Sequence, residues 1–293
     1  MDAERLIGDF SYYLRMERKL SPNTVASYTS EVRNFLQSSG IAPEQVGSGD
    51  IADYLGSRYG RMSKRTQSHI LSSLRSFYDY MIMEKLASEN PCDRVDTPKL
   101  GRYLPDVLSV EEVTAIIESV KTADVKGIRD RALLEILYGC GLRVSEACGL
   151  KISHVYLEDG FVRVVGKGDK ERLVPLGQMA ADAFRAYMEV RPDAAAPVYD
   201  DIAFLNRFGK PLSRVSVFNM IKKQAIAAGV DKEISPHTFR HSFATHMIEN
   251  GADLRIVQDM LGHESVLTTE IYTHIDTRTW QANVLSHHPR SRK

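Results

Sequence analysis

Cysteine is scarce in this chain of 293 residues. It has three, Cys92, Cys140 and Cys148, and no two of them form a Cys-x-x-Cys pair. The odd count argues against a disulfide framework, and the spacing argues against a zinc site. The chain also lacks a Walker-type glycine-rich loop that would bind a nucleotide. We therefore expect buried, reduced thiols, and neither a metal nor another cofactor.

An excess of charge is missing as well, because 38 lysines and arginines balance 38 aspartates and glutamates. A nucleic-acid-binding protein with this balance has to concentrate its positive charge locally. No apolar run approaches the roughly 20 residues that cross a bilayer, and the acidic start of the chain is unlike a signal peptide. We therefore expect a cytoplasmic protein. The hydrophobic share of 43% is that of an ordinary globular protein, and the length suits two domains.

The first hundred residues show a helical pattern throughout. Ser21 and Pro22 are typical of a helix start, and apolar residues recur at helical spacing from there to Gly40. A later helix has one apolar face, which consists of Ile70, Leu71, Leu74, Phe77, Tyr78 and Met81.

The most basic stretch of the first half, residues 58–66, lies just before this later helix. It is either a solvated helix start or a contact to DNA phosphates, which Arg and Lys side chains suit. Its candidate DNA-binding residues are Arg58, Arg61, Lys64 and Arg65.

Prolines and a glycine break the periodic pattern from Asn90 to Pro105. We therefore predict a helical domain over residues 1–95, a linker over 96–106 and a second domain over 107–293. A capping box at 109–112 opens the second domain.

The second domain is predicted to be helical apart from one β element. Strand-like runs at 152–157, 161–165 and 172–176 are separated by turn sequences, which predicts antiparallel hairpins with Lys167 at one tip. The expected fold class is mainly α with a small antiparallel β-sheet.

Six residues carry chemistry that suits the transfer of a phosphodiester without a metal. Arginines neutralise the charge that grows on phosphoryl oxygens, and a tyrosine can become the covalently linked nucleophile. The candidate catalytic residues are Arg143, Lys167, His237, Arg240, His263 and Tyr272.

Each of these residues alone has an ordinary interpretation. Arg143 and Glu146 can form a local salt bridge of little energetic value, and a tyrosine next to an isoleucine is usually core packing. His237 and Arg240 are three residues apart in a helix that begins near Ser235, so they share a face near a helix N-terminus. Such a pair is more often surface decoration, and only the joint pattern is specific.

The joint pattern resembles the tyrosine recombinase, or phage integrase, family over nearly the whole chain. Residues 141–146 look like the first arginine box of the family, and residues 165–172 look like its catalytic-lysine hairpin. Residues 236–246 look like the second box, and residues 261–263 with 271–274 look like the third. The Xer subfamily is the most similar, and the ending at 287–290 is similar to that of its XerD branch.

The resemblance implies a mechanism for these residues. Tyr272 would attack a scissile DNA phosphate, form a 3′-phosphotyrosyl link and free a 5′-hydroxyl. Arg143 and Arg240 would stabilise the five-coordinate transition state, and His263 would add a hydrogen bond to it. Lys167 would protonate the leaving 5′-oxygen.

His237 would then serve as a general base toward Tyr272, because a phenol with an unperturbed pKa of about 10 is a poor nucleophile at neutral pH. A 5′-hydroxyl from a partner strand would reverse the reaction. Energy is kept in the phosphotyrosyl bond, so the chemistry would need neither ATP nor metal.

The resemblance also implies an assembly and a biological role. Two domains would hold double-stranded DNA in a C-shaped clamp, and four subunits would exchange strands through a Holliday junction. The tail from Asp276 to Lys293, anchored by Trp280, Val284 and Leu285, would dock on a neighbouring subunit. A XerC-like partner, a dif-type site and an FtsK-like translocase would serve the resolution of chromosome dimers.

Three other functions fit parts of the pattern. An integrase or transposase of a mobile element would use the same chemistry on another target. A type IB topoisomerase would use a tyrosine to relax supercoils as a monomer. A non-catalytic DNA-binding protein on a decayed scaffold would fit the helical composition, although all six reactive groups are retained.

Overall fold

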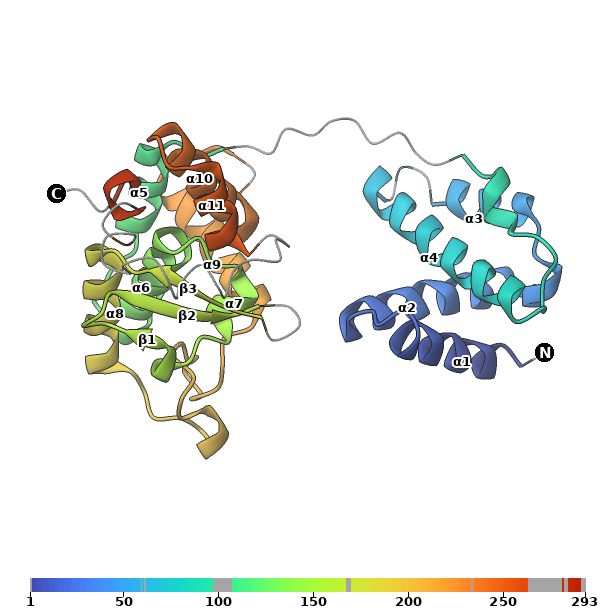
Figure 1. Ribbon diagram of the computed structural model, residues 1–293, viewed down its shortest axis with the longest axis horizontal. Coiled ribbons are helices and arrows are strands. Elements are labelled where there is room, and N and C mark those ends of the chain that lie inside the picture. Colours follow the sequence, from blue (N-terminus) through green and yellow to red (C-terminus); the bar gives the residue numbers. More distant parts are fainter. Residues whose placement is uncertain are drawn as a thin grey trace. The chain divides into compact units, whose positions relative to one another are not determined.

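In a computed structural model of the chain, the described residues are 2–58, 60, 62–96, 107–166, 170–232, 234–262, 281 and 284–290. They form two compact units, Met1–Tyr103 and Leu104–Lys293 (Figure 1). Helices dominate both units, and the second contains a three-stranded antiparallel sheet. The predicted fold class is therefore confirmed. Within the described residues, no helix is long and apolar enough to span a membrane.

The first unit is entirely helical in its described part. Its elements are α1 (Ala3–Met16), α2 (Pro22–Ser39), the 3-10 turn Pro43–Gln45, α3 (Ser48–Gly56), α4 (Lys64–Met83) and the 3-10 turn Pro91–Arg94. Ser21 caps α2 by accepting a hydrogen bond from the backbone N of Thr24 at 3.2 Å. Gly40 ends α2 with a φ of 65°. Both predicted helix boundaries are confirmed.

The apolar face of α4 packs into the core of the first unit. Phe10 and Phe77 are fully buried and meet edge to face, with ring centroids 5.3 Å apart. Cys92, in the turn Pro91–Arg94, is buried in the same core. Asn90 holds this turn by donating to Asp79 at 2.7 Å and accepting from the backbone N of Cys92 at 3.0 Å. The helical periodicity is therefore lost at Asn90 because a packed turn begins there. Pro91 cannot continue a helix, but the turn that it starts stays in the core.

The second unit combines its sheet with helices. Its elements are α5 (Val110–Glu118), α6 (Val125–Gly139), α7 (Val144–Cys148), the 3-10 turn Ile152–His154, β1 (Val155–Tyr156), β2 (Phe161–Val165), β3 (Glu171–Pro175), α8 (Gln178–Val190), the 3-10 turn Pro197–Tyr199, α9 (Arg214–Ala227), α10 (Pro236–Glu249) and α11 (Leu254–Leu261).

The sheet has the order β1-β2-β3, with both pairs antiparallel. Val162 is opposite Val174 and Val165 is opposite Glu171, so β2 and β3 pair antiparallel as predicted. The predicted place of Lys167 at the tip between them lies outside the described residues. The first strand is shorter than predicted, because residues 152–154 form a 3-10 turn and only two residues pair with β2. Ile152 and Leu157, which do not pair with β2, are apolar because they pack against the core.

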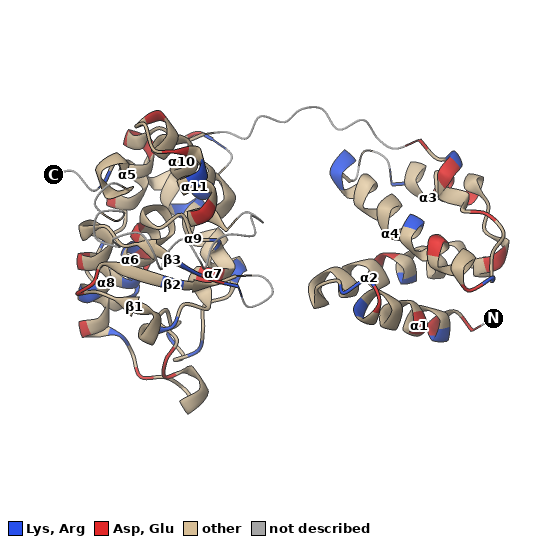
Figure 2. Cartoon of the chain, viewed as in Figure 1, with Lys and Arg blue, Asp and Glu red and all other residues tan. Residues whose placement is uncertain are grey.

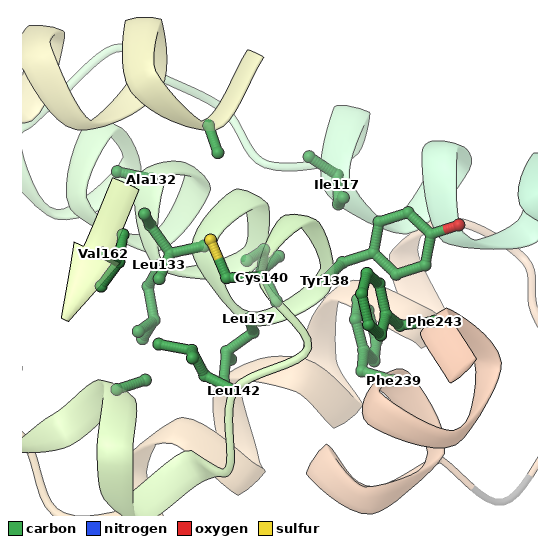
Figure 3. Close-up of a cluster of buried hydrophobic side chains, with 14 of the residues drawn as sticks. Ile117, Ala132, Leu133, Leu137, Tyr138, Cys140, Leu142, Val162, Phe239 and Phe243 are labelled. Atoms are coloured by element: carbon green, nitrogen blue, oxygen red, sulfur yellow. The ribbon is translucent and has the colours of Figure 1, made fainter. Parts of the chain in front are cut away.

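Helix α6 is the centre of the second core. Its residues Leu133, Leu134, Ile136 and Leu137 are all buried, which is typical of a helix that is covered on every side. Figure 3 shows Tyr138, near the end of this helix, beside Phe239 and Phe243 from α10. The packing fixes the end of α6, and with it the short connection that leads to α7.

The described part of the C-terminal tail packs on its own unit. Val284 is buried in the second core. The side chain of Asn250 donates to the backbone O of His287 at 2.9 Å. Arg290 is buried and donates to the two carboxylate oxygens of Glu135 at 2.6 and 3.2 Å. In this single chain the described part of the tail therefore has its apolar and charged partners on its own unit, and docking on a neighbouring subunit stays a prediction. Trp280 lies outside the described residues.

Candidate active site

The connection between α6 and α7 depends on a glycine. Gly141 has a φ of 58°, and a Cβ added there would lie 2.5 Å from a ring carbon of Phe243. Arg143 follows as the N-cap of α7, and its backbone N donates to the Glu146 carboxylate at 2.8 Å. Tight packing at Gly141 therefore fixes the path of the backbone, and with it the position from which the Arg143 side chain extends.

Gly141→Ala is expected to destabilise the second unit by about 2–5 kcal/mol, which sums the cost of a left-handed alanine and of overpacking against Phe243. Denaturant unfolding would measure the change. Gly229→Ala is the matched control, since Gly229 has a φ of 69° but no atom within 4 Å of an added Cβ. Equal losses in both variants would mean that the contact with Phe243 contributes nothing.

Three arginines lie within ion-pair distance of one buried carboxylate, that of Glu146. Glu146 Oε1 accepts from Arg143 Nη1 and from Arg172 Nη1, both at 2.9 Å. Glu146 Oε2 accepts from Arg172 Nη2 at 2.8 Å and lies 3.8 Å from Arg240 Nη1. Three cations and one anion leave a formal charge of +2. Such a cluster favours binding of an anion.

The carboxylate stays ionised in this setting. Burial by itself would raise the pKa of Glu146, but hydrogen bonds and charge from Arg172, joined by those of Arg143, hold the pKa below its usual value. Glu146 therefore remains a hydrogen-bond acceptor for both arginines at neutral pH.

Among the predicted catalytic residues that the structure describes, Arg240 is the most constrained. It lies on the buried face of α10 and is 8% exposed. Its Nη1 donates to the backbone O of Gly141 at 2.8 Å, and its Nη2 donates to the backbone O of Leu261. Burial, reinforced by the charge of Arg143, lowers the pKa of Arg240 to about 10, which still leaves it protonated at neutral pH. The guanidinium is a fixed positive charge.

Arg143 is more open. Its side chain is 38% exposed, and its Nη2 donates to the backbone O of Gly262 at 3.3 Å. Arg143 and Arg240 therefore hold consecutive carbonyls at the end of α11, those of Gly262 and Leu261. This end of α11 directly precedes His263 in the chain.

The structure brings together two of the predicted catalytic residues, Arg143 and Arg240. His237 is exposed in the first turn of α10, one helical turn before Arg240, and Ser235 caps that helix as predicted. Lys167, His263 and Tyr272 lie outside the described residues.

Sequence reasoning missed Arg172 as a site residue and gave Glu146 only a local role. Arg172 lies on β3 between residues of a period-two pattern, and it is buried together with Val174 and Leu176. This alternation was the available signal, because it places a charged residue on the inward face of a strand. A buried charge has to be paired.

The candidate DNA-binding residues fall into two groups. Lys64 and Arg65 are exposed in the first turn of α4, where Figure 2 shows basic residues at the start of the helix. Arg58 is half-buried, and its guanidinium lies 3.9 Å from the centroid of the Tyr54 ring. Arg61 lies outside the described residues.

No group of three or more His, Cys, Asp or Glu side chains in the described part of the chain is arranged to hold a metal ion. What the described site offers is a rigid set of guanidinium donors at the surface of the second unit. Such a set suits a phosphate, whose oxygens accept forked hydrogen bonds.

Comparison with known proteins identifies relatives over nearly the whole chain. The phage integrase family matches residues 106–278, and the phage integrase N-terminal SAM-like domain matches residues 7–85. Tyrosine recombinase XerD of Chlorobaculum tepidum is 43% identical over 98% of this chain and 97% of its own length. Tyrosine recombinase XerD of Staphylococcus saprophyticus is 40% identical over 98% of this chain and 100% of its own length.

Solved structures agree with these matches. XerA recombinase is 30% identical, with a TM-score of 0.51 over 99% of this chain and 100% of that one. A lambda integrase dimer bound to a core site is 19% identical, with a TM-score of 0.72 over 90% of this chain and 96% of that one. XerH bound to a palindromic difH substrate is 24% identical, with a TM-score of 0.71 over 94% of this chain and 83% of that one. The last two show likeness of fold.

Proposed function

This chain belongs to the phage integrase family of tyrosine recombinases, and we propose that it is a XerD-like recombinase that resolves chromosome dimers at a dif-type site. The observation that carries the proposal is the convergence of Arg143 and Arg240 on Glu146 and on the end of α11. Nearly full-length identity of about 40% to curated XerD proteins favours this branch over an integrase of a mobile element.

The first chemical step is the attack of the Tyr272 hydroxyl on the scissile phosphorus. The bond from phosphorus to the tyrosine oxygen forms, the bond to the 5′-oxygen breaks, and the phosphotyrosyl link stays on the 3′ side. His237 accepts the phenol proton, and Lys167 gives a proton to the leaving 5′-oxygen. Rejoining runs the same steps in reverse with a 5′-hydroxyl from the partner strand.

The arginines supply the electrostatic part of the catalysis. Negative charge grows on the non-bridging oxygens as phosphorus becomes five-coordinate, and donors that are already fixed stabilise it without reorganisation. Backbone carbonyls and Glu146 fix Arg240 and Arg143 before DNA arrives. His263, which follows Gly262, would donate a further hydrogen bond to the same oxygens.

The proposed assembly is a tetramer on two double-stranded DNA sites, containing a XerC-like partner and activated by an FtsK-like translocase. Its support lies in the relatives: one lambda integrase structure is a tetramer bound to a Holliday junction, and XerH was solved on difH DNA. The two domains would hold DNA between them. Because the proposed substrate is chromosomal DNA, the protein would act in the cytoplasm.

A plasmid with two directly repeated dif sites tests the proposal. Incubation with this protein and the XerC-like protein of the same genome should resolve the plasmid into two circles without added metal. A plasmid carrying the attachment sites of a mobile element from that genome is the comparison. Recombination of that plasmid alone would favour the integrase, and supercoil relaxation of both plasmids without exchange would favour a topoisomerase.

Removing the basic start of α4 is expected to weaken DNA binding without changing sequence preference. In the double variant Lys64→Ala and Arg65→Ala, the slope of log Kd against log salt should fall by about two, since each lost phosphate contact removes about one. Titration of labelled duplex at several salt concentrations measures this. Arg94→Ala is the control, because Arg94 is exposed and pairs with Glu89. An unchanged slope in the double variant would show that α4 does not contact phosphates.

A further inference from the structure

Arg172 is a buried arginine with three directional hydrogen bonds. Its side chain is 5% exposed. Its Nη1 and Nη2 form a fork on Glu146, and its Nε donates to the backbone O of Met260 at 2.7 Å. Its guanidinium is thus held in one plane by a carboxylate on one side and a helix end on the other.

Three separate segments of the active site meet at this guanidinium. Glu146 belongs to α7, which Arg143 begins. Met260 belongs to the last turn of α11, and a Cβ added to Gly262 would lie 3.3 Å from Arg172 Nη1. On the other side, a Cβ added to Gly166 would lie 3.7 Å from the same atom. The residues that directly follow these two glycines are His263 and Lys167.

The fork also decides how Glu146 is oriented. Each carboxylate oxygen of Glu146 takes one hydrogen bond from Arg172 and one from Arg143: Oε1 from the Arg143 side chain, and Oε2 from the Arg143 backbone N. Because Arg172 donates to both oxygens of this carboxylate, the remaining lone pairs of the carboxylate point in a fixed direction. Arg143 is therefore oriented through Glu146 by a residue that is itself buried.

A stabilising role alone explains this arrangement poorly. A buried ion pair gains little net stability, since desolvation offsets the attraction, and apolar residues of similar volume often serve as well. What a forked pair provides beyond an apolar contact is a defined geometry. The groups that share this geometry are those that the proposed reaction uses.

We propose that Arg172 is a positioning residue for strand cleavage: without contacting DNA, it aligns Arg143 through Glu146 and, through its bond to Met260, holds the helix end that precedes His263. This inference rests on the proposed function.

Arg172→Met keeps the length of the side chain and removes every hydrogen bond. Single-turnover cleavage of a nicked duplex should slow by about 100-fold, the effect of a misplacement on the order of 1 Å in a catalytic group. The Kd for intact duplex should stay within about threefold, because Arg172 is buried and phosphate contacts determine affinity. Arg172→Lys keeps the charge and can make one of the three bonds, so it should restore part of the rate.

Arg129→Met is the matched control for loss of a buried arginine. Arg129 is 11% exposed, donates to the carboxylate of Asp130 at 2.5 and 3.0 Å, and donates to the backbone O of Leu205 at 3.0 Å. Its loss should lower the melting temperature about as much as Arg172→Met but leave cleavage near the parental rate. The proposal is wrong if Arg172→Met cleaves like the parent, or if Arg129→Met loses as much cleavage.

The pH profile separates positioning from general destabilisation. Among the described residues, the charged groups that face Glu146 are Arg143, Arg172 and Arg240. Because Arg172 is the leading contributor that lowers the pKa of Glu146, Arg172→Met should raise that pKa. Its residual cleavage, divided by that of the parent at the same pH, should then fall toward acid pH, where a protonated Glu146 no longer accepts both bonds of Arg143. A variant profile parallel to the parent's would contradict the mechanism.

Both kinds of failure can be told apart in the same assay. An absent covalent product with the parent protein and its XerC-like partner would count against the proposed function itself. An active parent beside an unimpaired Arg172→Met would count only against the role of Arg172.

Discussion

Strand cleavage is expected to fall by about 10³-fold in Arg240→Ala, because removal of one preorganised donor to a developing oxyanion costs this much in other enzymes. The loss should appear in the single-turnover rate of cleavage of a nicked duplex. DNA affinity should change little, since many phosphate contacts share the binding energy. Arg240 is fixed by the carbonyls of Gly141 and Leu261, so in the parent it needs no rearrangement to meet the transition state.

Arg240→Lys distinguishes geometry from charge. A lysine keeps the positive charge but is a point charge without a fork, and it cannot bond both carbonyls and a phosphate oxygen in one plane. Most of the loss should therefore remain. Recovery to the parental rate in the lysine variant would show that Arg240 acts by charge alone. The melting temperature of both variants has to be measured beside the rate, since two buried carbonyls lose a partner in the alanine variant.

Tyr272→Phe is expected to abolish the covalent protein–DNA adduct altogether. The phenol oxygen is the atom that would bond to phosphorus, and phenylalanine has no atom to replace it, so the loss should be on the order of 10⁴-fold or more. The parent protein and the variant are each mixed with a nicked duplex carrying a dif core, without metal. Adducts that survive denaturation are then counted on a gel.

The outcomes of this trap are distinct. An adduct with the parent alone identifies Tyr272 as the nucleophile. An adduct of equal yield with Tyr272→Phe would assign the nucleophile to another residue. If both proteins bind DNA and neither forms an adduct, even with a XerC-like partner and other core sequences, catalysis is absent and the DNA-binding scaffold function takes its place.

Local features of the fold followed directly from the sequence. Ser21 with Pro22 and Ser235 with Pro236 begin helices where predicted, because capping and proline preference act within one turn of chain. Gly40 ends α2 because a left-handed residue is needed there. The antiparallel pairing of β2 with β3 was equally local, since alternating apolar residues on either side of a turn sequence predict it.

Errors arose where packing overrode local pattern. The apolar run at 152–157 reads as a strand, but most of it turns because it packs against the core beside a short edge strand. The helical pattern is also lost at Asn90, yet Cys92, two residues further on, is fully buried. Periodicity reports which residues are apolar, and it does not report which surface will cover them.

The sequence by itself determined the fold class and the helix boundaries at Ser21, Gly40 and Ser235, because these depend on residues that are near one another. The set of reactive side chains, which comes from a joint pattern of motifs, stays a prediction. Only the tertiary structure decided that Arg143, Arg172 and Arg240 share one carboxylate, since Arg172 is 26 residues from Glu146 and Arg240 is 99 residues from Gly141. Contacts at such separations form only when the core that surrounds α6 brings α7, β3, α10 and α11 together. The burial of that meeting point holds the arginines in fixed positions, since a buried charge must keep its partners.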